Sequence, residues 1–133
     1  MTVTDGDTLV VEPEFGGDRV KVRLHGIDAP EQKQPYGEVS KGFVIDIALF
    51  KSVEIEETAR DRYGRIVAIV WLPTGKSLQA ELLKAGLAWV WTRYCLNCEK
   101  WTDLQRRAME AKTGLWADGN PIAPWEWRRS PQR

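Results

Sequence analysis

The sequence lacks an excess of either charge, since its 19 lysines and arginines equal its 19 aspartates and glutamates. No overall positive field therefore attracts polyanions, and any binding of phosphate must be local. Histidine occurs once and cysteine twice, and a single C-x-x-C pair, Cys95 and Cys98, cannot complete a four-ligand zinc site. No apolar run approaches the roughly 20 residues of a membrane span, so we expect no segment in a membrane.

What the sequence does contain is typical of one soluble globular domain, with 133 residues of which 43% are apolar. We expect that domain to cover residues 1–117. Residues 118–133 hold three prolines and two tryptophans without usable periodicity, which predicts an irregular extension that Trp125 and Trp127 fold back onto the domain. Trp71, Trp101 and Trp116 are expected to pack in the core.

Segments 7–13 and 19–27 alternate apolar and polar residues and predict two strands. Gly16 and Gly17 lie between them and predict a tight hairpin turn. With these glycines at the centre of the turn, the strands form three expected pairs: Leu9 with Leu24, Val11 with Val22, and Glu12 with Lys21.

Apolar residues at helical spacing over 38–50 predict an amphipathic helix. Its expected core-facing stripe is Val39, Phe43, Ile47 and Phe50. Two further strands are expected over 52–57 and 65–72, and helices over 78–85 and 99–112, each followed by a glycine. The order β-β-α-β-β-α-α favours a small α+β barrel over a doubly wound sheet.

Several charged residues are predicted to converge near the hairpin. The expected register brings Asp7 and Asp28 onto one face at roughly 7–8 Å between Cα atoms. Like charges so placed repel each other unless a cation lies between them, and oxygen ligands favour calcium or magnesium. Glu31 adds a third acid, and Arg23 and Arg65 add guanidinium groups, which together suit phosphoryl transfer. The alternative is that the acids are merely exposed at strand ends.

Strict alternation places Arg23 on the opposite face of its strand from Asp28, so the strand must bend between them. Gly26 is the expected place, because a bulge at a glycine can redirect side chains. The single histidine, His25, is expected to face outward opposite Thr8 in a structural role.

Three blocks of sequence carry a family resemblance: Asp5-Gly6-Asp7-Thr8, residues 22–31 (VRLHGIDAPE) and residues 61–65 (DRYGR). Their order and spacing resemble the signature of staphylococcal-nuclease-like domains, and the likeness extends through residues 82–88 to the last helix. The resemblance implies a mainly β, α+β fold, an OB-like five-stranded barrel with three helices. The first strand, expected before Asp5, is truncated and almost absent, and would leave a sheet edge exposed.

The resemblance also implies an activity, the calcium-dependent hydrolysis of phosphodiester bonds in DNA and RNA, as an endo- or exonuclease that leaves 3′-phosphates. Single-stranded substrates are expected to be preferred. The implied calcium ligands are Asp7, Asp28 and the main-chain carbonyl of Ala29. The implied catalytic residues are Glu31 as general base, Arg23 on the scissile phosphate and Arg65 on the transition state. Arg62, Tyr63 and Tyr94 match family positions near the phosphate and base of the nucleotide.

Two segments differ from the best-known member of that family. The loop after Glu31 (QKQPYG) is shorter, and residues from Asp118 onward have no counterpart there. The chain begins only four residues before its first strong motif, which is typical of a trimmed mature chain or of an engineered start. Family habit favours a secreted or periplasmic protein over a cytosolic one. We expect a monomer, in which strand exchange could follow from a missing first strand.

Two other functions remain open from the sequence. Related barrels that have lost the active site bind nucleic acid or protein, but here Asp7, Arg23, Asp28, Glu31 and Arg65 are all present. A thiol-redox function would need an accessible pair of cysteines with a lowered thiol pKa. A local disulfide or two inert thiols explain the cysteines more simply.

Overall fold

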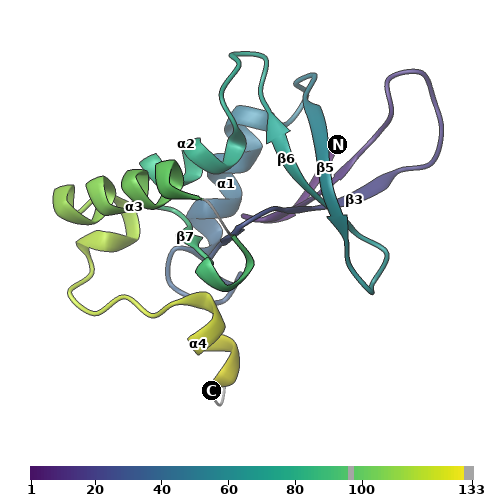
Figure 1. The fold of residues 1–133 in the computed structure, drawn as a ribbon. Coiled ribbons are helices and arrows are strands. Elements are labelled where there is room, and N and C mark those ends of the chain that lie inside the picture. The colour runs from purple at the N-terminus through teal and green to yellow at the C-terminus, as the bar shows by residue number, and fades with distance from the viewer. Residues whose placement is uncertain (96–97, 131–133) are drawn as a thin grey trace.

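The computed structural model describes residues 1–95 and 98–130, and its main feature is a five-stranded mixed sheet (Figure 1). In spatial order the strands are β1 (Thr2–Asp5), β2 (Thr8–Val11), β3 (Val20–Leu24), β6 (Ile66–Trp71) and β5 (Glu54–Arg60). Strands β3 and β6 are parallel and the other neighbours are antiparallel. The fold is mainly β, α+β and OB-like, as predicted, although β1 and β5 do not pair to close the barrel.

A second, two-stranded sheet lies beside the helices and positions the site. It pairs β4 (Ile27–Asp28) with β7 (Trp89–Val90) in antiparallel fashion, so that Asp28 lies opposite Trp89. Asp28 is therefore fixed by backbone pairing at a strand end.

Helices cover one end of the sheet. In Figure 1, α1 (Gly37–Ala48) lies beside the sheet, and α2 (Leu78–Lys84) and α3 (Glu99–Ala111) lie beyond it. These three match the predicted helices. Two short 3₁₀ helices, η1 (Thr92–Tyr94) and η2 (Gly114–Ala117), flank α3. Within the described residues, no helix is long and apolar enough to cross a membrane.

The C-terminal extension is not wholly irregular, which corrects that prediction. Residues Pro124–Arg129 form α4, with Pro124 at the first position, where its missing N–H costs no hydrogen bond. In Figure 1 the yellow segment runs from α3 to α4, which lies near β7. The pattern was missed because a helix of six residues is too short to show periodicity.

The core lies between the sheet, α1 and α2 and contains Leu9, Val22, Leu24, Ile27, Val44, Val70, Leu82 and Leu83, each 1% exposed or less. The predicted stripe of α1 was half right, because Phe43 and Ile47 pack against the core. It was wrong at Val39 and Phe50, which are 53% and 92% exposed, and it missed the buried Ser40 and Val44. Ser40 is buried because its hydroxyl donates to the carbonyl of Leu87 at 2.7 Å. A pattern of apolar residues alone cannot find such a position.

The predicted hairpin register was wrong by two residues. Leu9 pairs with Val22 and Val11 with Val20, not with Leu24 and Val22, and the expected partner of Glu12, Lys21, pairs with Val10. The connection spans residues 12–19 instead of a two-residue turn. Because a shift of two preserves the face of every side chain, the inward and outward residues are still as predicted. Thr8 pairs with Arg23, so the expected Thr8–His25 pair is also wrong.

The first strand is short but present. β1 has four residues and pairs with β2, Val3 lying opposite Leu9. It forms one edge of the five-stranded sheet, which is more than the near absence that the sequence suggested. Strand exchange stays a prediction.

Candidate active site

The chain turns sharply between Arg23 and Asp28. Strand β3 ends at Leu24, and Gly26 adopts a φ of 76°, a conformation that favours glycine. A Cβ there would lie 2.5 Å from Cys95 Sγ and 3.0 Å from the Trp101 ring. The predicted bend at Gly26 is confirmed, although it is a turn between two strands and not a bulge within one.

Because of that turn, the side chain of Arg23 returns to the segment that follows it. Its Nη1 donates to the carbonyls of Leu24 at 2.7 Å and Ile27 at 2.8 Å. Its Nη2 lies 3.4 Å from Asp28 Oδ1 and 3.7 Å from Asp7 Oδ2. One guanidinium thus fixes the turn and faces both predicted metal ligands.

Asp7 is buried and joins the first hairpin to the end of β4. Its Oδ2 accepts from the backbone N–H of Ala29 at 2.8 Å, and its Oδ1 accepts from the Thr8 hydroxyl at 3.0 Å. Burial by itself raises the pKa of Asp7, but the charge of Arg23 and hydrogen bonds with Asp5, the Ala29 backbone and Asp28 outweigh it and lower the pKa. Asp7 is therefore ionised when the site is folded.

Asp5 is a member of the site to which the sequence reading gave no role. Its Oδ1 accepts from the backbone N–H of Asp7 at 3.0 Å. Burial, followed by the charge of Asp7, raises the pKa of Asp5 to about 7, and Glu31 contributes in the same direction. The signal was available, because Asp5 and Asp7 are two residues apart at the end of a strand.

Asp28 is 1% exposed. Burial is the largest influence on its pKa, which it raises to about 6 with help from the charge of Asp7 and against the effect of arginines 23 and 128. A carboxylate in this position is held charged only by positive partners.

Glu31 lies in a tight loop between β4 and α1. Gln34 closes the loop, since its N–H donates to the Glu31 carbonyl at 2.9 Å and its Oε1 accepts from the Glu31 N–H at 3.0 Å. Gly37 N donates to Gln34 O at 2.9 Å, and a side chain on Gly37 would overlap the Glu31 carbonyl. The short loop therefore holds the backbone of Glu31 firmly.

Arg128 in α4 is the second residue of the site that the sequence reading missed. Its Nη2 lies 2.6 Å from Asp28 Oδ2, and its Nη1 lies 3.2 Å from Asp28 Oδ1 and 2.5 Å from Glu31 Oε1. The hydrogen bond to Asp28, the largest influence, and the one to Glu31 raise the pKa of Arg128. In sequence Arg128 was only half of a basic pair near the end of the chain, 97 residues from Glu31, and no local signal reveals such a contact.

Three further predicted residues, Arg62, Tyr63 and Arg65, lie on the turn between β5 and β6. Arg65 Nε forms an ion pair with Asp61 Oδ2 at 2.6 Å. Tyr63 is 70% exposed, and the guanidinium of Arg62 lies 5.3 Å from its ring centre. The parallel pairing of Val22 with Ile66 sets this turn beside β3. Arg65, however, is paired with Asp61 and not with Asp7 or Asp28.

Tyr94 lies in η1, and its side chain falls outside the part of the chain that the structure describes. Cys95 and Cys98 form a disulfide, one of the states that the sequence left open. His25 is half-buried, its Nδ1 lies 2.9 Å from the Thr58 hydroxyl, and its ring packs edge-on against Trp101.

The donor set suits a hard divalent cation. Four carboxylates line this turn through a series of contacts: Asp5 accepts from the backbone of Asp7, Arg23 lies near both Asp7 and Asp28, and Arg128 joins Asp28 to Glu31. Asp7 and Asp28 are almost fully buried. The charges that offset them are the guanidiniums of arginines 23 and 128. Oxygen donors in a cluster of like charge are what calcium or magnesium binds in proteins.

Comparison with known proteins agrees with this arrangement. Residues 21–118 match the family described as "Staphylococcal nuclease homologue". The chain is 40% identical over 129 residues to an Escherichia coli protein named "Uncharacterized endonuclease", an alignment that covers 96% of this chain and 82% of the relative. A Haemophilus influenzae protein of the same name is 38% identical over 129 residues, with 97% and 71% covered. An Arabidopsis thaliana protein named "Staphylococcal-like nuclease CAN1" is 38% identical over 114 residues, with 84% and 34% covered. The chain belongs to the staphylococcal nuclease homologue family.

Proposed function

We propose that this chain is a nuclease that uses calcium to hydrolyse phosphodiester bonds of DNA and RNA and leaves 3′-phosphate products. The observation that carries the proposal is the convergence of Asp7, Arg23, Asp28 and Glu31 around one buried turn. The names of the bacterial and plant relatives support the reaction class.

The carboxylates of Asp7 and Asp28 and the main-chain carbonyl of Ala29 would hold the cation, with Asp5 beside them. A backbone carbonyl can serve as a ligand whatever its side chain, so alanine is acceptable at this position. When bound, calcium would supply Lewis-acid polarisation of a phosphate oxygen and a template for the attacking water.

Glu31 is proposed as the general base that takes a proton from the attacking water. The water oxygen bonds to phosphorus and the bond from phosphorus to the 5′ oxygen breaks. The leaving 5′ oxygen takes up a proton from solvent and becomes a 5′ hydroxyl, and the phosphate stays on the 3′ oxygen. Arg23 Nη2 would bind the scissile phosphate. Arg65 would exchange Asp61 for the phosphate and stabilise the charge that builds in the transition state.

The substrate strand is proposed to extend over the turn that carries Arg62 and Tyr63, with Tyr94 as a further contact. An exposed tyrosine offers a stacking surface to an unpaired base, which favours single strands. We propose that the protein acts as a monomer, with residues 1–117 as the nuclease domain and 118–133 as an extension packed on it.

The test is the release of acid-soluble nucleotides from single-stranded DNA by three proteins, the natural chain, Glu31→Gln and Glu110→Gln. We expect cleavage with calcium and loss with EGTA. Glu31→Gln should lower kcat on the order of 10²- to 10⁴-fold, the usual contribution of a general base. Glu110→Gln is the matched control, because Glu110 is an exposed residue of α3 paired with Arg106. This variant should cleave at the normal rate.

One outcome would favour the alternative function. If the natural chain binds single-stranded DNA but does not cleave it with any divalent cation, the barrel acts as a nucleic-acid-binding module. Cleavage that survives EGTA would contradict the calcium requirement alone.

A further inference from the structure

The C-terminal extension is anchored next to the carboxylates through aromatic rings. The ring centre of Trp125 lies 5.7 Å from that of Trp89 and 5.9 Å from that of Trp91, the latter pair nearly parallel at 6°. Trp89 is the residue paired with Asp28 in the small sheet. The anchor of α4 and the backbone of Asp28 are therefore parts of one packed unit.

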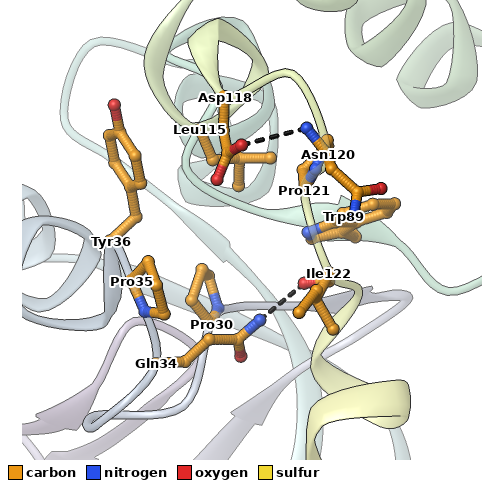
Figure 2. Close-up of a pocket in the computed structure, with 10 residues that line it drawn as sticks. All are labelled: Pro30, Gln34, Pro35, Tyr36, Trp89, Leu115, Asp118, Asn120, Pro121 and Ile122. Carbon is orange, nitrogen blue, oxygen red and sulfur yellow. Dashed lines mark hydrogen bonds between the residues drawn. The ribbon is translucent and has the colours of Figure 1, made fainter.

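A second anchor joins the extension to the loop of Glu31. Figure 2 shows Gln34 reaching the carbonyl of Ile122, to which its Nε2 donates at 2.5 Å. The same side chain accepts from the Glu31 N–H through its Oε1. A pocket between the loop and the extension is lined by residues of both and by Trp89 of β7 (Figure 2). Gln34 thus connects the extension to the proposed general base.

Between these anchors, Arg128 forms ion pairs with the carboxylates of Asp28 and Glu31. It contacts both oxygens of Asp28 and one of Glu31, and its guanidinium lies 5.4 Å from the ring centre of Trp91. Because Asp28 is 1% exposed and also within 3.4 Å of Arg23 Nη2, it has little room for another positive partner.

We propose that Arg128 is a displaceable counter-ion of this site, which holds Asp28 and Glu31 in the cation-free protein and must leave Asp28 when calcium binds. The inference rests on the proposed function, in which Asp28 is a calcium ligand. A divalent ion and a guanidinium on one buried carboxylate repel each other strongly, because the low dielectric of a buried site weakens screening. Arg23 also lies near Asp28, but the carbonyls of Leu24 and Ile27 fix its guanidinium. Arg128, which is carried by the extension, is therefore the partner of Asp28 that would give way to the ion.

Competition of this kind links the cation to the extension in both directions. If calcium weakens the contact of Arg128 with Asp28, docking of α4 must weaken calcium binding by the same factor. The extension then tunes how much calcium the site needs. The family match covers residues 21–118 and most of the site. Arg128, which lies outside that match, would then set the calcium affinity of the site.

Calcium titration of the DNA-free protein by calorimetry tests the proposal. Arg128→Gln should bind calcium at least about fivefold more tightly than the natural chain, the lower end of ordinary coupling between sites. Arg129→Gln is the matched control, since it removes the same charge from the same helix but from a side chain that is 78% exposed and paired with Glu126. Equal or weaker binding by Arg128→Gln relative to Arg129→Gln would overturn the proposal.

A second measurement covers the case in which Arg128→Gln folds poorly. Amide hydrogen exchange of α4 in the natural chain should become faster when calcium is added, and Trp125→Ala, which removes the aromatic anchor, should also bind calcium more tightly. Unchanged exchange in calcium-saturated protein, or no calcium binding by any variant, would reject the competition. The cleavage assay with EGTA decides separately whether the proposed function stands.

Discussion

The two sides of the proposed site are built in opposite ways. The carboxylate side is buried and cross-linked, with Asp7 and Asp28 tied to Arg23 and to the backbone of Ala29. The arginine side is an exposed turn in which Arg65 is held by Asp61. The difference indicates that the first side is preorganised and, under the proposed function, would set the position of the cation. The second can reorient toward a substrate at little cost to the fold.

Two glycines with nearly the same φ provide the sharpest test of this comparison. Gly26 (φ 76°) supports the carboxylate side and Gly64 (φ 81°) lies in the arginine turn. Gly26→Ala adds a methyl group within 2.5 Å of Cys95 Sγ, whereas nothing lies within 4 Å of the same atom at Gly64. We expect Gly26→Ala to cost about 3–4 kcal/mol of stability, and Gly64→Ala only about 1–2 kcal/mol from backbone strain.

Urea unfolding of both variants in calcium-free buffer measures these costs. Activity should follow stability for Gly26→Ala, because the turn aligns Arg23 with Asp28. Equal costs for the two variants would show that the carboxylate side is no more tightly packed than the arginine turn.

The buried carboxylate side should also make the free energy of unfolding fall as pH rises, an effect that the exposed arginine turn should not produce. Burial raises the pKa of Asp5 from 3.8 to about 7. Between those values the folded chain binds the extra proton, so stability without calcium should fall as pH rises from about 4 to about 7. Asp5→Asn removes the charge and should make the EGTA-treated protein about 1–2 kcal/mol more stable at pH 8.

The control for this pH effect is Asp46→Asn on the exposed face of α1, which should leave the pH profile of unfolding unchanged. If the natural chain instead becomes more stable between pH 4 and pH 7 in EGTA, the raised pKa of Asp5 is contradicted.

The same comparison explains what the sequence could predict. Asp7, Arg23, Asp28 and Glu31 lie within 25 residues and depend on one hairpin and one turn, so strand alternation and the glycine at 26 were enough to bring them together. The two-residue error in register did no harm because it preserved faces. Local patterns carry this side of the site.

Arg128 could not be predicted in the same way. Its contact with Glu31 joins residues 97 apart through α4, a helix too short for periodicity to reveal. The contact depends on the stacking of Trp125 on Trp91, which the sequence reading expected only as a general return of the extension. Contacts between distant segments depend on the packed fold as a whole, and short-range patterns do not encode them.

Arg62 on the exposed arginine turn gives the smallest expected effect, a change in KM without a change in kcat. Arg62 is proposed to contact a phosphate away from the bond that breaks, so Arg62→Ala should raise KM by a few-fold, ~1 kcal/mol or less, with kcat unchanged. One lost phosphate contact on a single strand should also reduce the slope of log KM against log salt by about 0.7. Arg60→Ala is the control, since Arg60 pairs with Glu57 on β5 at 3.2 Å and should change neither quantity. A fall in kcat for Arg62→Ala would instead place this residue at the scissile phosphate, where the proposal has only Arg65 from this turn.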